Sequence, residues 1–168
     1  LVSEQPWSAA VLLALELDRY QALPEHEPGW IARQLGIPTE VEALCLDLLE
    51  QTGQIVLQEG LYAPTGVGAV DLNSRGRGLE LRRFWAAVNG ERTRSGPGCS
   101  GAWNLFTVST ADLSRIKALQ REYYRAVRTV VAETEAMDHL VLANMQVVVL
   151  DAGPHPDGTS PMPKKEDC

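Results

Sequence analysis

The residues with the greatest capacity for chemistry are the histidines, and their spacing predicts no metal or catalytic site. His26, His139 and His155 lie far apart, and none stands with Cys, Asp or Glu at the spacing of metal ligands. His26 falls between Glu25 and Glu27 in an expected loop, where we predict a solvated side chain. We therefore expect no metal site in this chain.

The three cysteines are scattered, and they lack the spacing of a metal site or of a disulfide framework. Cys45 falls on the apolar stripe of a predicted helix, which favours burial as a small hydrophobic residue. Cys99 lies in a glycine-rich stretch, and Cys168 ends a polar tail. The pattern favours the reducing cytoplasm over an oxidising exterior.

Motifs for nucleotide binding or nucleophilic catalysis are also missing from the sequence. The glycine pairs at 66–68 and 76–78 lack the strand, loop and helix context of a phosphate site, and no G-K-[ST] occurs. Ser109 is better explained as a helix cap than as a nucleophile. Carboxylates are not paired at spacings that suggest acid–base work. We expect no enzyme, no catalytic residue and no cofactor.

Charge is distributed unevenly along a chain of ordinary globular composition, 45% hydrophobic and 22% charged. Residues 1–64 hold two basic and ten acidic groups, for a net charge of −8, whereas residues 65–136 hold eleven basic and seven acidic groups, for +4. The apolar run at 9–15 is too short to cross a membrane, and no basic segment precedes it as in a signal peptide. The sequence predicts a cytoplasmic protein with no membrane partner.

The first part of the chain has the order of elements of a winged helix-turn-helix. Residues 7–23 predict a helix with a wide apolar face, followed by a short helix that ends at Gly36. Thr39 and Glu42 form a capping box that opens a third helix. The inward stripe of this helix is expected to be Val41, Leu44, Cys45 and Leu48. Two short strands at 55–57 and 61–63, joined by a turn at 59–60, complete a winged-helix-like unit over residues 1–64.

A second, α+β unit with a long amphipathic helix is expected over residues 69–152. Its predicted elements are a helix at 78–89, a loop at 90–101, a strand at 102–108, a helix from 110 to about 135 and a strand at 140–150. Ser109 and Asp112 form a capping box for the long helix. Residues 153–168 contain too few apolar residues to pack and predict a disordered tail. The fold class is α+β.

Four stretches of the chain resemble a family of bacterial regulators. They are GWIARQLGIPTEVEALCLDLLEQTGQI, LRRFWAAV, LFTVSTADLSRIKALQREYYRAV and VLANMQVVVL. This pattern of apolar and aromatic residues resembles an uncharacterised, myxobacterial-type domain family of transcriptional regulators, in which the domain often follows a Cro/repressor-like helix-turn-helix. The resemblance implies a role in gene regulation and transfers no site residue. Leu at position 1, in place of a starting Met, is consistent with the loss of such an N-terminal DNA-binding domain, and any contact with DNA is then expected through that domain.

The predicted recognition helix is acidic on its outward face, which argues against DNA reading by this helix. That face holds Ala43, Leu46, Asp47 and Glu50. The expected wing offers Gln54, Gln58 and Glu59, again without Lys or Arg. Because basic residues supply most of the affinity for phosphates, protein contact is the better expectation for this surface. Leu12 and Leu13, on the wide apolar face of the first helix, are further protein-contact candidates.

Basic residues of the second unit are candidates for contact with phosphates or with an acidic partner. They are Arg75, Arg77, Arg82, Arg83, Lys117, Arg121, Arg125 and Arg128. The last four form one stripe on the long helix, nearly opposite its apolar face. A solvated helix face is the simplest interpretation of this stripe. Three hypotheses stay open: a regulatory domain that acts through a homo-oligomer or a protein partner, a direct DNA-binding protein, and a domain that senses a small-molecule effector.

Overall fold

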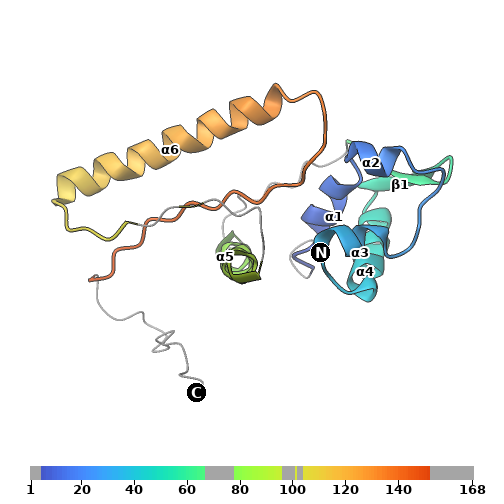
Figure 1. Cartoon of the computed structure of the whole chain (residues 1–168), viewed down its shortest axis with the longest axis horizontal. Helices are drawn as coiled ribbons and strands as arrows, with labels where there is room; N and C mark the ends of the chain where they lie inside the picture. Colours follow the sequence, from blue (N-terminus) through green and yellow to red (C-terminus); the bar gives the residue numbers. More distant parts are fainter. Residues whose placement is uncertain (1–4, 67–77, 96–100, 102–103, 152–168) are drawn as a thin grey trace, which may run out of the picture.

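The fold is α+β, with six helices and one two-stranded antiparallel sheet in the described residues (Figure 1). The computed structural model describes residues 5–66, 78–95, 101 and 104–151 of the 168. Its elements are α1 (Ser8–Ala14), α2 (Asp18–Gln21), α3 (Trp30–Leu35), α4 (Thr39–Gln51), β1 (Ile55–Gln58), β2 (Leu61–Pro64), α5 (Gly78–Ser95) and α6 (Thr110–Ala132). Position 69 and the predicted tail at 153–168 lie outside the described residues, so the division into units stays a prediction.

The first predicted helix is divided into two, so the expectation of one helix over 7–23 is wrong. Leu17, which precedes α2, has an extended backbone with ψ of 132°. The turn lets Leu15, Leu17 and Tyr20 all enter the same core, where each is buried. A continuous helix would spread these three side chains around its circumference, because successive residues are rotated by about 100°.

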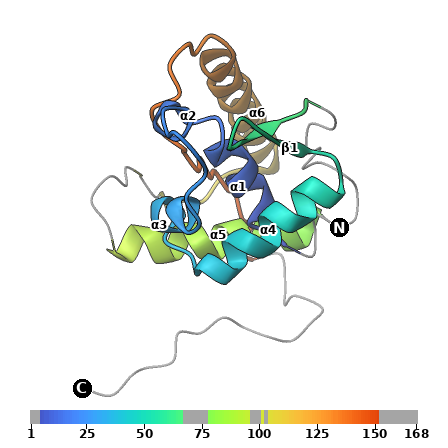
Figure 2. The same cartoon turned by 90° about the vertical axis from the view of Figure 1, so that its right-hand side faces the viewer.

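Helix α4 packs with α1, α3 and β1 and buries a different stripe from the one expected. Its buried residues are Glu42, Cys45, Leu46 and Leu49, whereas Leu44 is 52% exposed. The prediction of an outward Leu46 is therefore wrong, since this side chain is only 5% exposed. The capping box is wrong too, because α4 begins after Pro38 without a side-chain cap. Figure 2 shows α3 and α4 close together below α1.

The β hairpin follows α4 as predicted. Strand β1 pairs antiparallel with β2, with Gln58 opposite Leu61 at the turn. Glu59 and Gly60 both have positive φ, 49° and 87°, as a two-residue hairpin turn of type I′ requires. The amide of His26 donates to the Gly60 carbonyl at 2.7 Å, which fastens the loop after α2 to the hairpin. The turn residues and the short helix that ends at Gly36 are thus confirmed.

Helix α5 runs to Ser95 and extends over the first residues of the predicted loop at 90–101. It contacts the N-terminal part of the chain through an aromatic cluster, in which the Trp7 ring lies 5.5 Å from Phe84 and 5.3 Å from Trp85, both edge to face. At the other end of α5, the Arg92 guanidinium donates to the carbonyl of Leu35 at the end of α3. Two separate contacts therefore hold α5 against the N-terminal helices.

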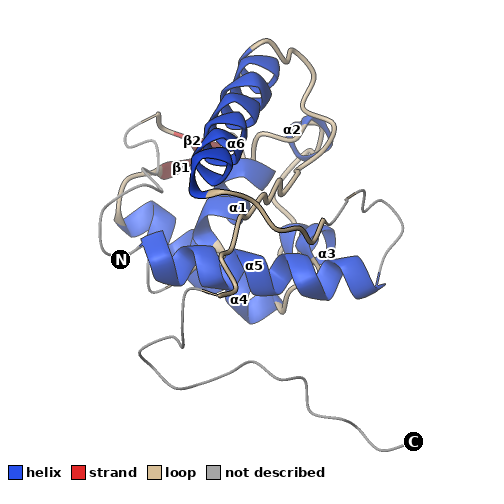
Figure 3. Cartoon of the chain, turned by 90° about the vertical axis from the view of Figure 1, so that its left-hand side faces the viewer, coloured by secondary structure: helices blue, strands red, loops and turns tan. Residues whose placement is uncertain are grey.

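Helix α6 is followed by an extended segment that returns alongside it (Figure 1). The predicted Ser109 cap is confirmed, because its hydroxyl accepts from the Asp112 amide at 3.1 Å. Neither predicted strand of the second unit is formed in the described residues: 104–108 and 140–149 run without a paired strand, Leu150 lies in a turn, and residues 102–103 lie outside the description (Figure 3). The backbone of Met137 exchanges two hydrogen bonds with Asp18, and Leu140 packs against the N-terminal core.

Among the helices that the structure describes, none combines the length and apolar character needed to cross a bilayer.

Candidate interaction surfaces

A buried carboxylate joins α4 to α3. Glu42 is 1% exposed, and its two oxygens accept from the amides of Gly29, at 3.1 Å, and of Ala32, at 2.6 Å. These amides belong to the N-cap residue and to the first turn of α3, where N-H groups have no partner within the helix. Glu42 thus caps α3 from another helix, and the negative charge lies at the favourable end of the α3 dipole.

Two aromatic residues continue this polar network. The Tyr20 hydroxyl lies 3.2 Å from Nδ1 of His26 and accepts from the Tyr62 amide at 3.2 Å, and His26 Nε2 lies 3.8 Å from Glu42 Oε1. Because the phenol proton is free to point to Nδ1, this geometry fits a neutral imidazole that carries its proton on Nε2. The prediction of a solvated His26 is wrong, since its side chain is 13% exposed.

Burial shifts the proton affinities of this network in the expected directions. Desolvation lowers the pKa of His26 below 6.5, against the opposing charges of Glu42 and Glu27. Desolvation also raises the pKa of Tyr20, in part against the hydrogen bond from the Tyr62 amide. The neutral side chains of His26 and Tyr20, together with the buried Glu42 carboxylate, therefore connect α2, α4 and β2. We interpret the network as a structural support of the surface above it.

The outer face of α4 carries the remaining acidic candidates. Ala43, Asp47 and Glu50 are exposed, as predicted. The charges of Glu50 and Asp47 also act on the hairpin. The pKa of Tyr62 on β2 is raised first by burial and then by these two charges. On α1, Leu13 is 48% exposed, whereas Leu12 is half-buried against the core. The exposed candidates of the N-terminal unit are therefore acidic or small, with Leu13 as the apolar exception.

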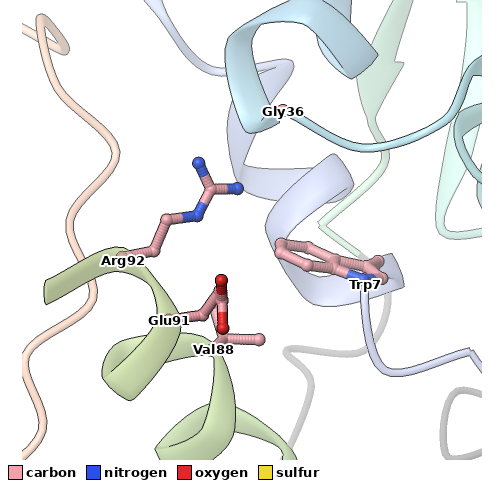
Figure 4. A pocket seen from close by; sticks show the side chains of 5 residues that line it. All are labelled: Trp7, Gly36, Val88, Glu91 and Arg92. Atoms are coloured by element: carbon pink, nitrogen blue, oxygen red, sulfur yellow. The ribbon is translucent and has the colours of Figure 1, made fainter. Parts of the chain in front are cut away.

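A shallow hollow lies where α5 meets the N-terminal helices (Figure 4). It has a volume of about 330 Å³ and is lined by Trp7, Gly36, Val88, Glu91 and Arg92. Arg92 reaches across it to the end of α3, where it donates to Leu35. Three other aromatic residues of the second unit, Phe106, Tyr123 and Tyr124, do not line the hollow and are exposed.

The basic stripe of α6 is exposed along its whole length. Its residues are Lys117, Arg121, Arg125 and Arg128. Of the other basic candidates, Arg82 and Arg83 are exposed on α5, and Arg82 donates to the carbonyl of Gly78 at 2.8 Å. Arg75 and Arg77 lie outside the described residues. The structure therefore brings four cations together on one helix face and leaves Arg82 and Arg83 on another helix.

Large apolar side chains are exposed on α6 and on the extended segments beside it, and we call them the C-terminal apolar surface. They are Leu105, Phe106, Val108, Leu119, Tyr123, Tyr124, Val130, Val131, Val141, Leu142, Met145, Val148, Val149 and Leu150. Leu113, Ile116 and Val127 on the same helix are half-buried, and α6 has no buried residue. Large exposed apolar patches on monomeric proteins often mark contact sites, so these side chains are candidates for a contact with protein.

Comparisons with family models, with curated proteins and with solved structures found no match to this chain.

Proposed function

We propose that this chain is a non-enzymatic regulatory domain of a bacterial transcriptional regulator, acting in the cytoplasm through protein contact or dimerisation. In this proposal the N-terminal helices and hairpin are a winged-helix-like unit that has lost direct DNA reading. The second unit supplies the contact with protein. The observation that supports the proposal most strongly is that the chain has both an acidic outer face on α4 and large exposed apolar side chains around α6.

The electrostatics of α4 oppose insertion into a DNA groove. A recognition helix in the major groove lies between two rows of phosphates. Asp47 and Glu50 are exposed on the face that would enter, and Glu59 lies exposed at the tip of the hairpin. Each would approach the phosphates with like charge and release no counterion, so this face lacks the main source of affinity for nucleic acid.

Direct DNA binding through α6 is the second candidate, and the basic stripe favours it. Lys117, Arg121, Arg125 and Arg128 are exposed on one side of a helix of 23 residues, a suitable form for contact with a phosphate row. Effector sensing through the hollow beside Trp7 is less well supported, because the hollow is shallow and Arg92 already bonds to Leu35 across it.

A salt titration with DNA separates the first two candidates. The fluorescence anisotropy of a labelled random duplex is measured against the chain at about 50 and about 200 mM salt. A protein that contacts six to ten phosphates loses about 10³-fold or more in affinity over this range. We expect no such binding. Tight binding with that salt dependence, abolished in Arg121→Glu/Arg125→Glu but kept in the control Arg82→Glu/Arg83→Glu, would replace protein contact with DNA contact through α6.

A further inference from the structure

The segment from Leu140 to Leu150 has the composition of a strand but no strand beside it. It is rich in β-branched and aliphatic residues, and most of its side chains are exposed, with Val141 at 75% and Val148 at 67%. In the described part of the chain, the one hydrogen bond to its backbone is made by the Gln120 side chain, which donates to the Met145 carbonyl at 2.7 Å. An extended apolar segment with free backbone groups is a template for pairing with another strand.

The two faces of this segment differ in a way that restricts how it pairs. Because side chains alternate along a strand, the odd-numbered residues share one face and the even-numbered residues share the other. The odd face is entirely apolar: Val141, Ala143, Met145, Val147 and Val149. The even face carries two amides at its centre, Asn144 and Gln146. Charged or titratable side chains are absent from 140–150 and begin again at His139 and Asp151.

We propose that residues 140–150 pair antiparallel with the same segment of a second copy of this chain, in a register centred on Met145. The inference deepens the proposed function and rests on it, because it names the protein partner. In an antiparallel pair the numbers of opposed residues have a constant sum. Opposed side chains lie on the same face of the sheet, so the odd-numbered apolar residues of the two strands share a face only if this sum is even. A sum of 290 pairs residue 140 with residue 150 and so pairs the whole uncharged stretch with itself.

This register is self-complementary, as a two-fold symmetric contact requires. Leu140 lies opposite the partner's Leu150, and no like charges face each other along the ribbon. At its ends, His139 lies opposite the partner's Asp151. A shift of two residues would leave part of the stretch unpaired at each end and would place Asp151 opposite an apolar residue. Charge and polarity therefore select one register.

The amount of exposed apolar surface also fits a second copy. A stable interface buries about 800 Å² on each partner, and its core is richer in apolar area than the rest of the surface. The C-terminal apolar surface offers fourteen large side chains, each 40% to 78% exposed, to such an interface. Figure 1 shows the segment after α6 returning beneath the helix, and the Gln120 side chain of α6 donates to the Met145 carbonyl at 2.7 Å. In the proposed dimer the apolar face of α6 covers the paired ribbon. Its basic stripe lies on the opposite side and would stay in solvent.

A charge exchange at Met145 tests the pairing. Met145 is 48% exposed and lies opposite itself in the proposed register. We expect the parent chain to be a dimer by light scattering at about 50 μM, and Met145→Lys and Met145→Glu each to weaken dimerisation about a hundredfold or more, because like charges meet directly. Mixing the two variants is expected to restore a dimer with one chain of each. Leu57→Lys, at a position 51% exposed on β1, is the matched control and should leave the dimer intact.

Each alternative outcome has a definite meaning. A parent chain that is monomeric at about 50 μM, a dimer that survives both Met145 variants, or a mixture that stays monomeric would each overturn the pairing. If circular dichroism shows that the charged variants unfold, Met145→Cys with Cys99→Ser and Cys168→Ser decides: oxidation must give a covalent dimer, and the absence of one overturns the proposal. A confirmed dimer that also binds DNA with steep salt dependence contradicts the proposed function and leaves the pairing in place.

Discussion

Removal of the Glu42 carboxylate is expected to destabilise the N-terminal core far more than the loss of one surface charge. In Glu42→Ala, the amides of Gly29 and Ala32 lose acceptors at 3.1 and 2.6 Å. A buried donor left without a partner costs about 1–3 kcal/mol. Two such donors, together with the cavity left by a side chain that is 1% exposed, give an expected loss of about 3 kcal/mol in the free energy of unfolding.

The assay is urea denaturation followed by circular dichroism at 222 nm, with Glu40→Ala as the matched control. Glu40 lies two residues earlier on the same helix, is exposed and belongs to the same first turn. Its replacement removes the same charge without removing a described hydrogen bond, so we expect a change of at most about 0.5 kcal/mol. Glu42→Gln should fall between the two, because it keeps one carbonyl oxygen as an acceptor. Equal losses in Glu42→Ala and Glu40→Ala would refute the capping role.

Three further predictions concern the same core. Burial lowers the pKa of His26 below its unfolded value of 6.5, so the unfolded state binds the proton more tightly. The free energy of unfolding is therefore retained above about pH 6.5 and falls as the pH drops below it. Denaturation midpoints measured from about pH 5 to pH 7.5 should show a smaller pH dependence in His26→Gln. Leu46→Ala should cost about 2–5 kcal/mol of unfolding free energy and Leu44→Ala less than about 1, and a reversed order in chemical denaturation would restore the stripe expected from the sequence. Burial raises the pKa of the Cys45 thiol, so in a Cys99→Ser/Cys168→Ser background Cys45 should react with a thiol reagent no faster than the chain opens, and immediate labelling would contradict its burial.

Local chemical signals predicted the elements that depend on neighbouring residues alone. The hairpin turn at Glu59 and Gly60 and the helix end at Gly36 each require backbone angles with positive φ, which few residues adopt readily. The Ser109 cap needs only an amide three residues further along the chain. In each case the interaction that fixes the structure lies within a few positions of the residue that predicts it.

Helix α4 shows where periodicity alone is insufficient. Val41, Leu44, Cys45 and Leu48 have the same spacing as Glu42, Cys45, Leu46 and Leu49, and the first set contains four apolar residues instead of three. The chain nevertheless buries the second set. The Glu42 carboxylate gains two backbone amides at the start of α3, and this contact with another helix rotates α4 by about one residue. The sequence does contain a signal for this contact. Glu42 is the one charged residue in a set, with Cys45, Leu46 and Leu49, that otherwise has the apolar spacing of a buried helix face.

The second unit shows a different dependence, because a strand is defined by a neighbour and not by its own residues. The β-branched residues of 140–150 predict a strand, yet the backbone groups of this segment lack strand partners in the described residues. A helix satisfies its amides within one segment, whereas a strand leaves them free until a second strand arrives. The same reasoning explains why α6 forms without a buried residue, while the strand expected beside it does not. If the partner is another copy of the chain, the sheet and the regulatory contact form in one step, and the strand exists only when the protein is assembled.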